Sequence, residues 1–223
     1  MVIVHHLNNS RSQRVLWLLE ELGVPYEVKR YERDAKTMLA PPELRDVHPL
    51  GKSPVISDGD EVVAESGAII EYLADKYGQG RLIPPHGTAA RRCVTYWLHY
   101  AEGSLMPPLV MSLIFSKVRS APMPFFAKPI AQGIADKVMD GFVTPNITTH
   151  LDFLEDELAK SAWFGGEEFG VSDIQLSFPL EAAAARGGLD ESRPRLSAFL
   201  QRIHARPAYQ RALEKGGPYD LMR

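Results

Sequence analysis

The chain has 223 residues, of which 45% are hydrophobic and 24% charged, and its formal net charge at pH 7 is -3. This composition is typical of a globular protein with one large domain or two modest ones, and it offers no basic surplus for nucleic acid. The one cysteine, Cys93, excludes an intrachain disulfide framework and a cysteine-rich zinc site, and we expect it in the core. The chain shows no signal-peptide pattern and no apolar run of about 20 residues, so we expect a cytoplasmic protein that does not cross a membrane.

Residues 1–82 predict a small α/β domain. Val2 to Leu7 is rich in β-branched residues, which favours a buried strand. Apolar residues then recur with helical spacing up to Leu22, and Gly23 supplies a stop. A second strand follows Pro25. A strand, a helix and a strand in this order favour a parallel pair of strands.

The rest of this domain predicts a short helix, a hairpin and a final helix. We expect the short helix around residues 42–46. Two strands, residues 54–57 and 61–64, flank the sequence SDGDE, whose Asp-Gly pair is a hairpin signal. Residues 65–77 carry apolar side chains at helical spacing, and Gly78 follows them. The expected order of elements is therefore βαβ-α-ββα.

Strand signals almost vanish after a linker that we place at residues 83–89, so residues 90–223 predict an all-helical domain. A long helix over 89–119 should be interrupted at Pro107-Pro108, and a helical stretch over 130–160 should be irregular near Pro145. Three further helices are expected at 172–186, 195–205 and 208–215. Asp173 lies three residues after Gly170, which can serve as a helix cap, while Ser172 and Gln175 offer an alternative capping box.

Pro54 stands at the entrance of a predicted strand, where it cannot donate a ladder hydrogen bond. One explanation is an edge strand. The other is a cis Ser53–Pro54 peptide bond, which would turn the backbone of Ser53 outward. The N–H and C=O of Ser53 would then be free to pair with an extended peptide ligand.

Glu65 and Ser66 stand at the start of the last helix of the first domain. The free N–H groups and the dipole of a helix N-terminus favour an anion, although Ser66 could simply cap the helix. Glu65 could receive an ammonium group. A carboxylate beside anion-accepting donors complements the head of an α-amino acid, so the pair predicts a site for a zwitterion.

These motifs carry a family resemblance. GKSPVI, with ESGAIIEYL ten residues beyond its proline, resembles the glutathione-binding half of the glutathione S-transferase superfamily. HLNNSRSQRVLWLLEELGVPYE, APPEL and EGSLMPPL are similar to a theta-like fungal and bacterial branch of serine type. The resemblance implies an α/β plus all-α architecture, in which a thioredoxin-like domain precedes a helical one that forms the electrophile-binding side. It also implies a homodimer that uses glutathione as co-substrate, without a metal.

The resemblance assigns roles to individual residues. Pro54 matches the cis proline of the family, and Ser53 matches the residue whose backbone pairs with the cysteinyl part of glutathione. Glu65 and Ser66 match the residues that hold the γ-glutamyl group. Lys52 stands where a cation can meet the glycyl carboxylate, the alternative being a solvated surface lysine. Glu102 resembles an acid that the family brings toward the amino group of glutathione.

The residue that activates the thiol is expected in the turn after the first strand. A free thiol has a pKa of about 8.5 and reacts as the thiolate, so the enzyme must supply a hydrogen-bond donor near the sulfur. The turn has no tyrosine or cysteine. Ser10, four residues before Arg14, resembles the serine-type members of the family, and Asn9 is the alternate candidate. A capping role for Ser10 is the structural alternative.

The resemblance implies a glutathione transferase that attacks a small hydrophobic electrophile, with peroxide reduction or thiol exchange open. The alternative is a glutathione-binding or regulatory member without catalysis. A thioredoxin-type reductase is disfavoured because it would need its own cysteines in the first turn. Tyr100, Met106, Met111 and Phe115 could line an apolar wall, but such a pattern is more often core. The histidines lack metal-ligand spacing, and His5 and His6 should point to opposite faces of a strand.

Overall fold

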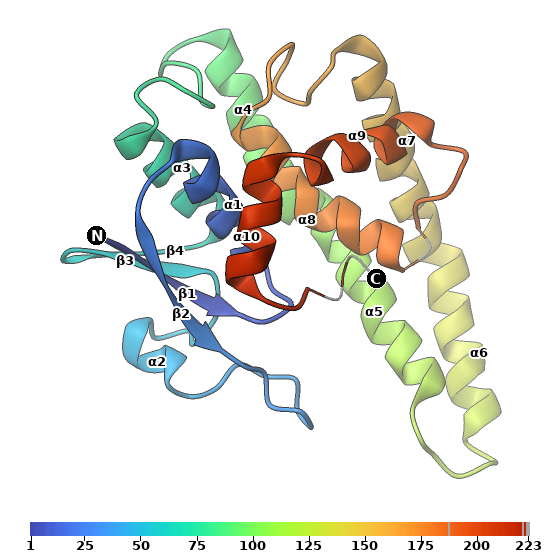
Figure 1. The fold of residues 1–223 in the computed structure, drawn as a ribbon. Coiled ribbons are helices and arrows are strands. Elements are labelled where there is room, and N and C mark those ends of the chain that lie inside the picture. The colour runs from blue at the N-terminus through green and yellow to red at the C-terminus, as the bar shows by residue number, and fades with distance from the viewer. Residues whose placement is uncertain (187, 220, 222–223) are drawn as a thin grey trace.

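The computed structural model describes residues 1–186, 188–219 and 221. A four-stranded sheet with its helices forms the N-terminal part, and a bundle of helices forms the remainder (Figure 1). The strand order is β2-β1-β3-β4. The bounds are β1 Val2–Leu7, β2 Tyr26–Tyr31, β3 Val55–Asp58 and β4 Glu61–Ala64.

The pairing of the strands reproduces the expected topology. β1 pairs in parallel with β2, as the strand–helix–strand order predicted, and antiparallel with β3. β3 and β4 form the predicted hairpin. The helices of this part are α1 Ser12–Leu22, α2 Leu44–Val47 and α3 Ser66–Tyr77. The βαβ-α-ββα order of a thioredoxin-like domain is thereby confirmed.

The remainder of the described chain is helical apart from one isolated bridge between Trp163 and Gly166. Its α-helices are α4 Ala89–Tyr100, α5 Met106–Ser120, α6 Lys128–Val138, α7 Thr144–Lys160, α8 Val171–Ala185, α9 Pro194–His204 and α10 Pro207–Gly216. The two predicted irregularities are π-helical turns, Ala101–Leu105 before Pro107 and Met139–Val143 before Pro145. A proline lacks the N–H that would continue the helical pattern, so each turn widens just before its proline.

Helix α8 runs through the middle of the molecule, between the sheet domain and the outer helices (Figure 1). Every residue from Val171 to Ala183 is buried. A helix that is buried all round is a core element, and α8 contacts α1, α3, α4, α5 and α9. One continuous hydrophobic core therefore joins the two parts of the chain, and α10 folds back to pack on α1.

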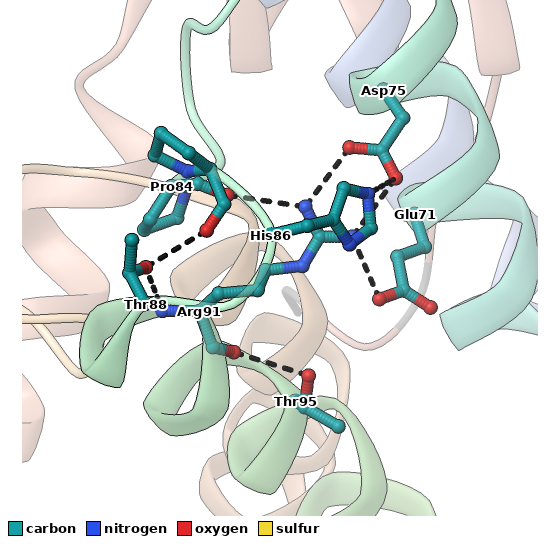
Figure 2. A network of polar contacts seen from close by, with 8 residues as sticks. Glu71, Asp75, Pro84, His86, Thr88, Arg91 and Thr95 are labelled. Carbon is teal, nitrogen blue, oxygen red and sulfur yellow. Dashed lines mark hydrogen bonds and ion pairs between the residues drawn. The ribbon is translucent and has the colours of Figure 1, made fainter.

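A buried arginine fastens α4 to α3. The guanidinium of Arg91, 5% exposed, donates to both carboxylate oxygens of Asp75 (2.9 Å each) and to Glu71 (2.9 Å), and Figure 2 shows these contacts. It also donates to the carbonyl of Pro84 in the connecting segment (3.2 Å). The hydrogen bonds that Arg91 donates to Asp75 raise the pKa of Arg91, so the guanidinium keeps its charge.

One expectation about the helical part is wrong, and one of the two capping alternatives does not form. Cys93 is exposed, because it falls outside the buried stripe of α4 that includes Val94 and Trp97. The capping box of Ser172 and Gln175 does not form, since among the described residues the Ser172 hydroxyl has no partner. Instead Gly170 caps α8, and the carboxylate of Asp173 accepts from the N–H groups of Gly170 and Phe164 (2.9 Å each).

Gly170 is a glycine because the connecting segment lies against it. A Cβ at this position would stand 2.7 Å from the carbonyl oxygen of Leu82, and that oxygen accepts from the N–H of Val171 (2.9 Å). The cap of the core helix is thus docked on the segment between the two parts of the chain. No side chain fits there without moving backbone.

Replacing Gly170 by alanine should therefore lower the free energy of unfolding by about 1–3 kcal/mol, the usual cost of an overpacked site. Gly133→Ala is the matched control, because Gly133 lies inside α6 with open space at its Cβ position. That change should raise stability by about 0.5–1 kcal/mol. Urea unfolding of both variants measures the difference, and equal stabilities would contradict this account of the cap.

The two neighbouring histidines of β1 have separate partners, as expected from their opposite faces. His5 hydrogen-bonds to the hydroxyls of Tyr31 and Ser57 (3.0 Å each). His6 Nδ1 pairs with the hydroxyl of Ser12 (2.8 Å). Burial, and secondarily the charge of Arg30, lowers the pKa of His6 from 6.5 to about 4. The His6 imidazole is therefore neutral at neutral pH.

This lowered pKa makes stability depend on pH. The unfolded chain takes up a proton at His6 below pH 6.5, whereas the folded chain does so only near pH 4. The stability that the neutral His6 contributes is fully present above pH 6.5. As the pH falls to about 4, the free energy of unfolding decreases by about 3 kcal/mol. In His6→Gln, the decrease in the free energy of unfolding between pH 6.5 and pH 4 should be smaller by that amount. His99→Gln, which removes an exposed imidazole, is the control, and identical pH profiles for wild type and His6→Gln would refute the assignment.

In the described part of the chain, no helix is both long and apolar enough to cross a membrane. The same residues contain no group of three or more His, Cys, Asp or Glu side chains placed to hold a metal ion.

Candidate functional site

A cleft of about 340 Å³ opens where the starts of α1, β3 and α3 meet the π-helical turn after α4. It brings together all six residues that the sequence predicts to bind glutathione: Lys52, Ser53, Pro54, Glu65, Ser66 and Glu102. They come from three separate segments of the chain. Arg11 and His48 complete the polar part of its wall, Leu50 and Ala64 are apolar neighbours, and none of these four was predicted.

The edge of the cleft at Ser53 is formed by the backbone at the entrance of β3. The Ser53–Pro54 peptide bond is cis, and β3 lies inside the sheet between β1 and β4, so the edge-strand explanation is wrong. The Ser53 hydroxyl donates to the carbonyl of His5 (2.9 Å), which holds the residue in place. Among the described residues, the backbone of Ser53 makes no turn, loop or cap hydrogen bond.

Glu65 and Ser66 line the cleft at the start of α3. Glu65 has a φ of 72°, a region that non-glycine residues seldom occupy, and such outliers often occur at ligand sites. Its side chain is exposed, whereas Ser66 is 3% exposed and begins α3. The Ser66 hydroxyl accepts a hydrogen bond from Arg14 (3.1 Å) rather than capping the helix.

Glu102 reaches the cleft from the π-helical turn and carries two arginine contacts. One carboxylate oxygen lies 2.5 Å from Arg14 Nη2 and the other 2.9 Å from Arg11 Nε. Burial alone would raise the pKa of Glu102, but the charges of Arg14 and Arg11 outweigh it and lower that pKa. The carboxylate is therefore ionised and still borders the cleft.

Arg14 contacts two of the residues that line the cleft, Ser66 and Glu102. Its side chain is 1% exposed and donates to Ser66, to Glu102 and, at 2.5 Å, to the carbonyl of Gln175 on α8. Burial lowers the pKa of Arg14 and Glu102 opposes this effect. In the sequence, Arg14 served only to define the spacing from Ser10. Its position within the apolar face of α1 was the available signal, because an arginine is almost never fully buried unless it is paired.

The predicted activating turn has a different arrangement. The Ser10 side chain is 4% exposed, its Oγ pairs with Ser12 Oγ (2.7 Å) and accepts from the N–H of Ser12 (3.2 Å). Ser10 does not line the cleft. Asn9, the alternate, is half-buried with a φ of 49°. The side chain of this turn that borders the cleft is Arg11.

Arg11 could have been suspected from charge alone. It is the N-cap residue of α1, where the helix dipole favours an anion and disfavours a cation. Its guanidinium lies 5.3 Å from the centre of the Phe178 ring and pairs with Glu102. A cation held at such a place raises the electrostatic potential at the cleft.

A second cleft, of about 480 Å³, adjoins the first and shares Arg11, Leu50, Lys52 and Ser53 with it. Its other side is formed by the segment after β2 and by α2. None of the helical residues considered for an apolar wall lines this cleft, and two of them, Tyr100 and Met106, belong to the core at 7% and 4% exposed.

Comparison with known proteins identifies the family. Residues 10–76 match the family described as "Glutathione S-transferase, N-terminal domain", and residues 136–202 match "Glutathione S-transferase, C-terminal domain". Glutathione S-transferase 1 of Saccharomyces cerevisiae is 34% identical over 223 residues, 96% of this chain and 95% of the relative. Glutathione S-transferase 3 of Schizosaccharomyces pombe is 34% identical over 216 residues, 96% of this chain and 88% of the relative.

Solved structures agree. A glutathione S-transferase from Actinobacillus pleuropneumoniae superposes with a TM-score of 0.79 at 33% identity, covering 100% of this chain and 96% of that one. A sphingomonad glutathione S-transferase, solved in complex with glutathione, gives a TM-score of 0.74 at 25% identity over 96% of this chain and 98% of its own. The fold, the cleft and these relatives together show that the chain belongs to the glutathione S-transferase superfamily.

Proposed function

We propose that this protein is a glutathione transferase that binds glutathione in the cleft between Lys52 and Glu102. The observation that carries the proposal is the convergence of all six predicted residues on that cleft. The backbone at Ser53, the cations Lys52 and Arg11 and the acids Glu65 and Glu102 all line this cleft, and such a set suits an extended tripeptide with a zwitterionic head.

In the proposed complex the γ-glutamyl ammonium lies between Glu65 and Glu102, and its carboxylate meets the start of α3 at Ser66. A helix N-terminus favours an anion, and the two carboxylates favour the cation. The cysteinyl backbone pairs with Ser53 beside the cis proline. Lys52 meets the glycyl carboxylate.

The thiol of a ligand bound in this way faces the turn at Asn9, Ser10 and Arg11. A hydrogen-bond donor and the charge of Arg11 favour the thiolate, which then attacks an electrophile. Reduction of a peroxide starts from the same thiolate, so peroxidase activity is included in the proposal. We further propose a cytoplasmic homodimer of the theta-like branch, as the family resemblance implies, with the hydrogen-bond donor supplied by Ser10 or by Asn9.

A member that binds glutathione without catalysis is the second candidate. The observation that favours it is the burial of Ser10, whose hydroxyl already pairs with Ser12. Catalytic hydrogen bonds are often formed only in the complex, so this geometry leaves Ser10 and Asn9 as competing donors.

The binding proposal is tested with Glu65→Gln, which removes a charge from the zwitterion site and keeps the shape. We expect the Kd for glutathione, measured by isothermal titration calorimetry, to rise about tenfold, or roughly 1.4 kcal/mol. Glu61→Gln removes the same charge from an exposed position on β4 and should leave the Kd unchanged. Equal affinities of the two variants would sink the assignment of Glu65.

The catalytic proposal is tested with a chromogenic aryl halide and cumene hydroperoxide as acceptors for wild type, Ser10→Ala and Asn9→Ala. We expect Asn9→Ala to lose more than about tenfold in kcat, and Ser10→Ala less, since the Ser10 hydroxyl is held by Ser12. The reverse order would show that Ser10 turns toward the thiol when glutathione binds. Wild type that binds glutathione and turns over neither acceptor would support the second candidate.

A further inference from the structure

Helices α5 and α6 form a hairpin that extends from the helical part of the molecule, toward the lower right of Figure 1. Its far end is the connection of residues 121–127. Within the described chain, α6 packs mainly on α5 and on the π-helical turn Met139–Val143, and Ala135 is its only buried residue. None of residues 112–137 belongs to the continuous hydrophobic core. The end of the hairpin is nevertheless rich in apolar side chains.

Phe125 and Phe126 lie in the turn at the end of the hairpin. The carbonyl of Pro124 accepts from the N–H groups of Ala127 (3.0 Å) and Lys128 (3.3 Å), so the two phenylalanines occupy the central positions of that turn. Their rings meet edge to face, with centroids 5.7 Å apart, and the residues are 86% and 67% exposed. Phenylalanine is usually buried, so an adjoining pair with this exposure indicates a contact surface.

The apolar surface continues onto α6 and its backbone is restricted. Ile130 and Ile134 lie one helical turn apart on α6, and both are exposed. Pro122 and Pro124 precede the aromatic pair and Pro129 follows it. Each proline ring fixes one backbone dihedral angle, which limits the conformations that the connection can adopt. The sequence therefore favours a surface that keeps the two rings in water.

The charge of this region is opposite to that of the rest of the chain. Residues 103–135 contain Lys117, Arg119 and Lys128 and no acid, a formal charge of +3. Because the whole chain carries -3, the remaining residues carry -6. Arg119 pairs with Asp136 (3.1 Å), whereas Lys117 and Lys128 form no ion pair with any residue that the structure describes. Exposed aromatic rings and unpaired positive charge thus occur together at the end of the hairpin.

These charges decide between two occupants of the apolar surface. In a contact between two copies around a twofold axis, the surface would meet itself, and Lys117 and Lys128 would face their own counterparts. Like charges across an interface are unfavourable. A surface of anionic lipids instead complements the lysines, while the boundary between head groups and acyl chains takes up apolar side chains. A hairpin end that projects from the protein also reaches a flat surface without needing a groove in its partner.

We propose that the end of the α5–α6 hairpin docks on membranes that contain anionic phospholipids. Phe125 and Phe126 enter the boundary between head groups and acyl chains, and Lys117 and Lys128 meet the lipid phosphates. The contact is peripheral, in keeping with the finding that no helix of the described residues could cross a membrane. None of these four residues lines the glutathione cleft, so docking requires neither glutathione nor catalysis.

Partition of the full chain between water and lipid vesicles tests the proposal. Sedimentation compares vesicles of phosphatidylcholine and phosphatidylglycerol, in a ratio of about two to one, with vesicles of phosphatidylcholine alone. We expect the partition coefficient to be at least about tenfold higher for the anionic vesicles. Salt at about 1 M, where the screening length is about 3 Å, should remove most of this difference.

The aromatic contact is tested by Phe125→Ser combined with Phe126→Ser. This double change should lower the partition coefficient for anionic vesicles at least about tenfold, because both rings leave water on docking. Phe142→Ser is the matched control and should leave that coefficient unchanged. Phe142 is exposed as well, but it lies at the other end of α6. At a rise of about 1.5 Å per residue it is roughly 20 Å from Phe126, beyond the depth of about 5–10 Å that an interfacial contact reaches.

The charge contact is tested by Lys128→Gln, which should lower the partition coefficient for anionic vesicles about fivefold. Lys137→Gln removes the same charge from an exposed position nearer to the base of the hairpin, and its effect should be less than about twofold. Thermal unfolding by circular dichroism checks that all variants are folded. We expect wild-type stability in each, since every side chain that is changed is exposed.

Three results would overturn the inference. The first is a wild-type partition coefficient that is equal for anionic and neutral vesicles. The second is an equal loss in the double phenylalanine variant and in Phe142→Ser, which would place the lipid contact away from the end of the hairpin. The third is a smaller assembly of the double variant by light scattering, which would assign this surface to a contact between copies of the chain.

Discussion

The buried guanidinium of Arg14 is the interaction on which the candidate site depends. It lies on α1 and reaches the start of α3, the π-helical turn after α4 and the backbone of α8 through Ser66, Glu102 and Gln175. A charge with 1% exposure is tolerated only where its partners are in place. The positions of Ser66 and Glu102 in the cleft therefore depend on how the two parts of the chain pack, because both side chains bond to Arg14.

The rest of the architecture keeps that junction together. Helix α8 is buried on all sides, α10 packs on α1, and the Arg91 clamp fastens α4 to α3. The cleft lies across this junction, with its backbone edge on the sheet side and Glu102 on the helical side. A ligand that contacts both sides of the cleft meets groups whose relative positions are fixed by a single hydrophobic core.

The two adjoining clefts differ in charge, and Arg11 is common to both. Glu65, Glu102, Arg11 and Lys52 are the acidic and strongly basic side chains that line the first cleft, beside the start of α3. Among the described residues, the charged side chains that line the second cleft are all cations. Because Arg11 lines both clefts beside Ser53, its charge raises the electrostatic potential in each of them.

Much of the fold followed from local patterns. Hydrophobic periodicity, Gly23 and the Asp-Gly turn predicted the strands and helices of the first domain to within a residue or two, and Pro107 and Pro145 marked the two π-helical turns. Local signals succeed where one residue's geometry dominates, as with a proline that cannot donate. They failed at Cys93 and left two alternatives for the cap of α8, at Gly170 and at Ser172, because exposure and capping there depend on which neighbouring segment packs alongside.

The motif from Gly51 to Leu73 by itself determined the family, the backbone edge at Ser53–Pro54 and the pairing of Glu65 with Ser66, since these lie close together along the chain. Only the tertiary structure decided what stands opposite them. The burial of Ser10 with Ser12, the role of Arg14 and the cationic cleft of Arg11 and Arg33 arise from contacts between segments far apart in sequence. Electrostatic potential depends on distance in space, which the order of residues does not supply.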